Sequence, residues 1–180
     1  MKKLLTLVLL ASSFSAFSQD RIPVVLQDRS FYLSILDPGV MFEQRLSDNQ
    51  SFTATLGITG LANSFEDELG EDEFTYSINP YLTSSFRNYY SRKRVKKELN
   101  SNSGNYVGLV AGYYFGALAE GDRTTELTNS FFIGPEWGIQ RNYKSGIHFG
   151  LSLGTGLATG QNTDVQWTGL GRIRLGFRIK

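Results

Sequence analysis

Cysteine is absent from all 180 residues of the sequence. The chain can therefore form no disulfide bond and can carry no lipid-modified N-terminal cysteine. Histidine occurs once, at His148, and the spacings typical of metal-binding, hydrolytic, Walker and dinucleotide-binding motifs are missing. The sequence accordingly predicts no catalytic residue, no metal site and no cofactor.

After its first residues, the chain also has no run close to the roughly 18 consecutive apolar residues that mark a membrane-spanning helix. Hydrophobic residues nevertheless make up 41% of the chain. If the protein lies in a membrane, it must cross with strands. The 19 glycines and the 13% aromatic residues suit such strands, because small interior positions make room for large ones and aromatic rings collect at membrane interfaces.

Residues 1–18 have the three parts of a cleavable export signal: two lysines, an apolar run and a stretch of small residues. Such a segment is too short to span a membrane as a helix and is removed during export. We therefore expect the mature chain to begin at Gln19. Residues 19–180 are long enough for one domain, either a small soluble core or a barrel of eight strands.

Apolar residues alternate with small or polar residues along about eight stretches of the chain. Period two is the pattern of a β-strand whose two faces have different surroundings. Two short strands flank the turn signal Asp37-Pro38-Gly39. The alternation is clearest at 51–59, and the other predicted strands lie at 31–35, 40–46, 74–90, 107–118, 133–140, 147–154 and 172–179.

Two prolines, Pro80 and Pro135, fall inside predicted strands. Proline cannot donate a hydrogen bond to the neighbouring strand, and a closed barrel has no edge on which to place it. We therefore expect a β-bulge at each proline.

The two faces of the predicted strands differ in chemistry. The apolar face would contact lipid through Phe52, Leu56, Ile133, Trp137, Leu151, Leu153 and Leu175. The polar face carries charged residues that would line the lumen, namely Glu43, Arg45, Arg87, Glu136, Arg172 and Arg174. Unpaired charges in a narrow lumen are costly, so we expect these residues to pair and to fill it. A selective pore is the alternative.

The connections between strands fall into two sets. One set contains acidic segments at 66–73 and 120–126, and the other contains the basic segment 92–97. In an up-and-down barrel alternate connections share an end, and longer loops face outward, so we assign the acidic end to the cell exterior. The acidic segments lack the spacing of a calcium loop. The basic segment would lie against anionic head groups, and no nucleic-acid partner is expected.

The strand pattern, the export signal and the final strand from Thr168 to Lys180 resemble the small outer-membrane β-barrels of the OmpA/OmpX type, in the porin-like superfamily. The resemblance implies an all-β fold, specifically an up-and-down antiparallel transmembrane β-barrel of about eight strands. It also implies a monomer in the cell outer membrane that contacts lipid, lipopolysaccharide and the barrel-assembly machinery. Its role would be structural, or would involve surface interactions through the external loops.

Two further alternatives remain open from the sequence. A soluble lipocalin-like barrel that binds a small apolar ligand would turn the apolar face inward and the charges outward. A lipid-modifying enzyme of the outer membrane would need His148 to meet a hydroxyl and a carboxylate on neighbouring strands.

Overall fold

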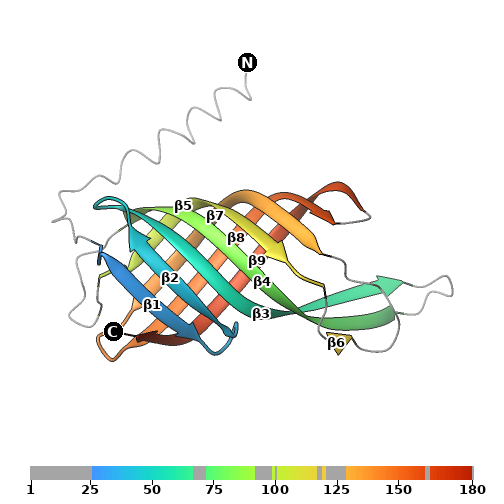
Figure 1. Ribbon diagram of the computed structural model, residues 1–180, viewed down its shortest axis with the longest axis horizontal. Helices are drawn as coiled ribbons and strands as arrows, with labels where there is room; N and C mark the ends of the chain where they lie inside the picture. The colour runs from blue at the N-terminus through green and yellow to red at the C-terminus, as the bar shows by residue number, and fades with distance from the viewer. Residues whose placement is uncertain are drawn as a thin grey trace, which may run out of the picture.

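The structure is a computed structural model that describes residues 26–66, 72–91, 99, 101–116, 119–120, 129–160 and 163–179. Within this part of the chain, eight antiparallel strands form a closed ring (Figure 1). They are β1 (Arg29–Ser34), β2 (Gly39–Arg45), β3 (Gln50–Glu66), β4 (Asp72–Ser91), β5 (Gly104–Tyr114), β7 (Ser130–Asn142), β8 (Ile147–Gly160) and β9 (Thr163–Ile179). The two-residue β6 (Ala119–Glu120) pairs with β4 beyond the end of β5.

The strand order around the ring is β3-β2-β1-β9-β8-β7-β5-β4, and pairing of β3 with β4 closes it. Strands that follow one another in the chain are therefore neighbours, and the last strand meets the first. This arrangement confirms the predicted all-β, up-and-down antiparallel fold of about eight strands. The predicted turn at 37–39 joins β1 to β2.

Several predicted features lie at least partly outside the described residues. They are the export signal at 1–18, the basic segment 92–97 and most of the acidic segments 66–73 and 120–126. Among the residues that are described, no helix is long and apolar enough to cross a membrane.

Each strand buries one face inside the ring and exposes the other. In β7, for example, Phe132 and Glu136 are buried, whereas the two chain neighbours of Phe132, Phe131 and Ile133, are exposed. Successive side chains of a strand point to opposite faces, so the period-two sequence pattern produces this division directly. Buried apolar residues form two small clusters within the ring: Tyr81, Val110, Tyr114 and Phe132 in one, and Leu26, Tyr89 and Tyr106 in the other.

The β-bulges predicted at Pro80 and Pro135 are wrong, because the strand register continues through both residues. Next to Pro80, the side-chain amide of Asn79 donates to the carbonyl of Phe115 at 3.0 Å, and the amide of Phe115 donates to the carbonyl of Pro80 at 2.9 Å. Asn79 thus supplies the donor that proline lacks. At Pro135 the ladder with β8 is interrupted and then resumes in the same register.

Register shifts occur elsewhere. One lies between Tyr89 and Ser91 on β4, and the other lies between Ala158 and Gly160 on β8. Both are close to strand ends, where an extra residue disturbs few ladder hydrogen bonds.

The wall of the ring is uneven in height. β1 and β2 have six and seven residues, whereas β3 and β9 on either side of them each have 17. Figure 1 shows β3 and β4 continuing together past the ends of the other strands. The short hairpin of β1 and β2 therefore closes the ring over only part of its length.

Candidate functional site

Charged side chains of both signs are buried inside the ring. Asp37 comes from the turn between β1 and β2, and five others come from four different strands: Glu43, Arg87, Glu136, Arg172 and Arg174. Each strand residue has the parity that points inward, so the alternation places all five in the interior. They occupy three groups, which share few contacts.

The first group surrounds Glu43 on β2, whose side chain is fully buried. Ser51 and Tyr89 donate to its Oε1 at 2.7 and 2.8 Å, and Tyr32 and Gln140 donate to its Oε2 at 2.9 Å each. Four neutral donors therefore satisfy this carboxylate, and no arginine lies within ion-pair distance of it among the described residues. Charge-assisted hydrogen bonds of this kind compensate the loss of water around the carboxylate.

The second group joins Arg87 on β4 to Glu136 on β7. The Nε of Arg87 lies 3.5 Å from Oε1 of Glu136, and both side chains are almost entirely buried. The Nη1 of Arg87 donates to Oε1 of Gln140 at 3.0 Å, and its guanidinium lies 4.4 Å from the ring centroid of Tyr106. Ser85 donates to the same oxygen of Glu136. Gln140 links this group to the first.

The third group contains Arg172 and Arg174 from β9. The Nε of Arg174 lies 3.5 Å from Oδ2 of Asp37, which also accepts a hydrogen bond from Tyr81 at 2.8 Å. Arg172 lies 4.2 Å from the ring centroid of Tyr81 and donates to Tyr114 and, at 3.2 Å, to Thr83. Among the described residues, no carboxylate lies within ion-pair distance of Arg172.

Arg45 does not join these groups, although its parity on β2 matches that of Glu43. It lies at the last position of the strand, where its guanidinium pairs with the exposed carboxylate of Asp28. Its partner is thus a residue near the start of β1 at the end of the ring, and not a charge inside the lumen.

His148 lies inside the ring beside Asn142, whose Oδ1 is 2.8 Å from the Nδ1 of the imidazole. Its ring packs on Tyr32 with a centroid separation of 4.4 Å. Within the described part of the chain, neither ring nitrogen is hydrogen-bonded to a hydroxyl or a carboxylate. The arrangement that a histidine-dependent hydrolase needs is therefore not assembled around this residue.

The residues that precede β1 and β5 close the end of the ring nearest Glu43. Asn102 is buried, and its carbonyl accepts hydrogen bonds from Gln140 at 3.0 Å and from Asn142 at 2.9 Å. Its side-chain oxygen accepts from the amide of Gln27 at 2.7 Å. This residue has a φ of 62°, the left-handed conformation that asparagine tolerates better than most residues.

The interior tyrosines were not among the residues expected from the sequence. Tyr32, Tyr81, Tyr89, Tyr106 and Tyr114 are all buried, and four of them contact a buried charge through the hydroxyl. Strand parity carries a signal for this placement, because Tyr81 and Tyr89 alternate in phase with Arg87. From aromatic content alone, these rings were expected at the membrane interfaces and not inside the ring of strands.

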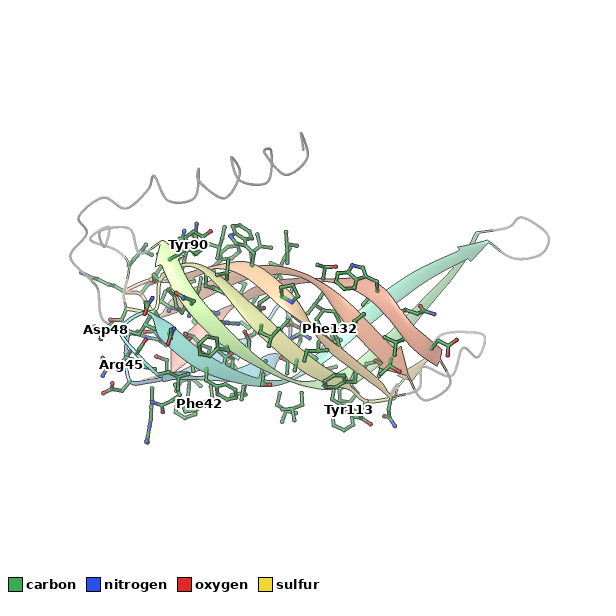
Figure 2. The ribbon with its side chains drawn as sticks, turned by 90° about the horizontal axis from the view of Figure 1, so that it is seen from above. Phe42, Arg45, Asp48, Tyr90, Tyr113 and Phe132 are labelled. Carbon is green, nitrogen blue, oxygen red and sulfur yellow. The ribbon has the colours of Figure 1, made fainter. Side chains whose placement is uncertain are left out.

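The outer face of the ring is apolar. Five of the residues predicted to face lipid are exposed, namely Phe52, Leu56, Ile133, Leu153 and Leu175, and the other two, Trp137 and Leu151, are partly exposed on the same face. Trp137 donates from its indole nitrogen to the hydroxyl of Tyr90 at 2.6 Å. In Figure 2, Phe42 and Tyr113 lie on the outside of the ring, whereas Phe132 lies within it.

The described residues include no group of three or more histidine, aspartate and glutamate side chains placed to hold a metal ion. Comparison with known proteins gives no match: no family model fits the chain, and no curated protein or solved structure matches it. What the protein does must therefore be inferred from the placement of its own side chains.

Proposed function

We propose that the protein is a monomeric β-barrel of the cell outer membrane, of the small OmpA/OmpX type, with a lumen filled by side chains. Its role is structural or is exercised through the loops at the acidic end. The observation that carries this proposal is the distribution of polarity, which is the reverse of that in a water-soluble protein: the charges are inside the ring and the apolar residues are outside.

The apolar surface is too extensive for a soluble monomer. Large hydrophobic residues are exposed on every strand of the ring, with examples in Phe31, Val40, Leu56, Leu82, Leu109, Ile133, Leu153 and Leu175. Soluble monomers seldom expose a contiguous apolar patch beyond a few hundred Å². Lipid is the solvent that such a surface requires, and closure of the ring removes the free strand edges that lipid does not tolerate.

A soluble lipocalin-like barrel fits these observations less well. A carrier of a small apolar ligand needs an apolar interior, whereas this interior holds Glu43, Arg87, Glu136 and Arg172. The same contents argue against a wide channel, because the arginines and tyrosines occupy the space that water would need. A role in catalysis is not proposed, since His148 is hydrogen-bonded to neither a hydroxyl nor a carboxylate within the residues that the structure describes.

Membrane fractionation of cells that express the full chain tests the proposal. We expect the protein in the outer-membrane fraction, with heat-modifiable mobility on a detergent gel, because a folded barrel binds less detergent than the unfolded chain. A product that stays in the soluble periplasmic fraction would show that the polarity of the surface has been misinterpreted.

A further inference from the structure

The wall of the ring is interrupted between β3 and β9. β9 pairs with β1 only from Gly176 to Ile179, and β3 pairs with β2 only as far as Gly57. The turn between β1 and β2 then spans the gap, through hydrogen bonds from the amide of Ile35 to the carbonyl of Leu175 and from the amide of Ile58 to that of Pro38, each 2.8 Å long. Beyond this turn, β3 and β9 do not pair with each other in the described part of the chain.

A cavity of about 200 Å³ lies at this interruption. Its apolar lining comes from Leu36, Ile58 and Ile173, which belong to the turn, β3 and β9 and are all exposed on the outside of the ring. Its polar lining includes Asp37 and Arg172 on the inside. The cavity therefore connects the apolar outer surface with the third group of interior charges.

The opening lies within the apolar outer surface. Along β9, Ile173 lies between the exposed residues Trp167 and Phe177, so apolar surface continues on both sides of it. If the ring spans a membrane as proposed, this opening faces lipid. Unpaired backbone groups at the two strand edges would be costly there unless a polar group fills the gap.

Arg172 has capacity for a further partner. Its guanidinium has more N–H donors than the two that Thr83 and Tyr114 engage, and more than nine-tenths of the residue is buried. In the third group, Asp37 is already paired with Arg174, so this carboxylate does not compensate the charge of Arg172, the arginine that lines the cavity. A buried cation without an anionic partner is costly.

We infer that this opening binds the phosphate head group of an anionic phospholipid on Arg172, with the acyl chains in the bilayer against Leu36, Ile58 and Ile173. The inference rests on the proposed membrane location. Arginine is suited to the role because its planar guanidinium matches phosphate oxygens through paired hydrogen bonds. A lipid head group fits better than a free anion because the cavity opens toward the apolar surface.

Native mass spectrometry of the full-length mature protein, released from nanodiscs of phosphatidylcholine mixed with phosphatidylglycerol, tests the inference. We expect the unmodified protein to retain phosphatidylglycerol in preference to phosphatidylcholine. Arg172→Met should lower that retention roughly tenfold, as expected for the loss of hydrogen bonds to a charged group. Arg45→Met is the matched control and should leave retention unchanged, since Arg45 pairs with Asp28 at the end of the ring.

A second variant tests the opening without altering the interior charges. A Cβ atom at Gly60, on the β3 side of the cavity, would meet nothing within 4 Å. Gly60→Trp should therefore fold, cover the opening from outside and lower the retention of phosphatidylglycerol. Heat-modifiable mobility verifies that each variant is folded before its lipids are counted.

The failures of the two proposals can be told apart. A protein that does not enter nanodiscs and shows no heat-modifiable mobility would overturn both. A folded, inserted protein that retains phosphatidylglycerol equally with arginine or methionine at position 172 would overturn only the lipid site. Displacement of the lipid by inorganic phosphate at similar concentration would identify a site for free anions and would also overturn it.

Discussion

The ion pair between Arg87 and Glu136 provides the sharpest test of the filled interior. We consider Glu136→Gln, which keeps the shape of the side chain and its capacity to accept the hydrogen bond from Ser85. What it removes is the negative charge 3.5 Å from the Nε of Arg87. Among the described residues, Arg87 then has no carboxylate within ion-pair distance and keeps close contacts with Gln140, Met41 and the ring of Tyr106.

The size of the effect follows from burial. The side chains of Arg87 and Glu136 are only 2% and 4% exposed, and breaking a buried pair by removing one partner costs about 3–5 kcal/mol. The exposed pair of Arg45 with Asp28 is the matched comparison, because its side chains are 31% and 74% exposed. Removing that pair should cost no more than about 1 kcal/mol.

A double-mutant cycle isolates the interaction from the other effects of each substitution. We expect Arg87→Met to restore part of the stability lost in Glu136→Gln, with a coupling energy of about 1–3 kcal/mol. Urea unfolding from phospholipid vesicles measures each free energy. The fluorescence of Trp137 and Trp167, the only tryptophans of the chain, and the heat-modifiable mobility report the transition.

Two results would refute the reasoning. Strictly additive losses in the double variant would mean that Arg87 and Glu136 do not interact in the folded protein. Equal losses for Glu136→Gln and for Asp28→Asn would mean that the interior is as well solvated as the end of the ring.

Three further outcomes are expected. Leu153→Arg, on the outer face of β8, should lower the free energy of unfolding in vesicles by about 2–4 kcal/mol, whereas Leu46→Arg, in the turn after β2, should lower it by about 0–1 kcal/mol. Because Leu153 and Leu46 are both 54% exposed, equal losses would argue against a bilayer around the ring. In planar bilayers the unmodified protein should show no steady porin-like current. Joint replacement of Tyr32 and Gln140 by alanine should allow current to pass, because their side chains fill the lumen around Glu43. Large steady currents from the unmodified protein would instead favour transport. Asn79→Ala should lower the free energy of unfolding in urea by about 1 kcal/mol. Adding Pro80→Ala to that variant should recover part of the loss, because a backbone N–H then faces the carbonyl of Phe115. No recovery would mean that Asn79 acts in another way.

The strands could be predicted because their signal is local. The predicted stretches 133–140 and 147–154 fall inside β7 and β8, and the turn at 37–39 joins β1 to β2, as its residue types indicate. Alternation also separates the residues of β9 that point inward, such as Arg172, from those that point outward, such as Leu175. A period of two requires no knowledge of the neighbouring strand.

The partners of the interior charges could not be predicted in the same way. Glu43 has the parity of a lumenal acid, but its four hydrogen bonds come from residues between eight and 97 positions away in the chain. Arg45 has the same parity and lies at the end of the ring. The height of a residue within the ring depends on the stagger of every strand pair between it and its partner, and alternation carries no information about stagger.

The prolines show the same limit on a smaller scale. Proline within a strand predicts a bulge only if its missing donor is needed by the neighbouring strand. At Pro80 the need is met by the side chain of Asn79, and the sequence does not reveal that Phe115 would lie opposite.

By itself, the sequence determined that this chain forms strands with one polar and one apolar face, because both properties follow from the alternation of neighbouring residues. Tertiary structure alone decided that tyrosine, serine and glutamine donate the hydrogen bonds to Glu43, and that Arg172 has no carboxylate partner among the described residues. It also decided that β3 and β9 are separated where the short hairpin of β1 and β2 ends. These features depend on ring closure, which brings together the first and last strands and sets their register by the sum of all pairings between them.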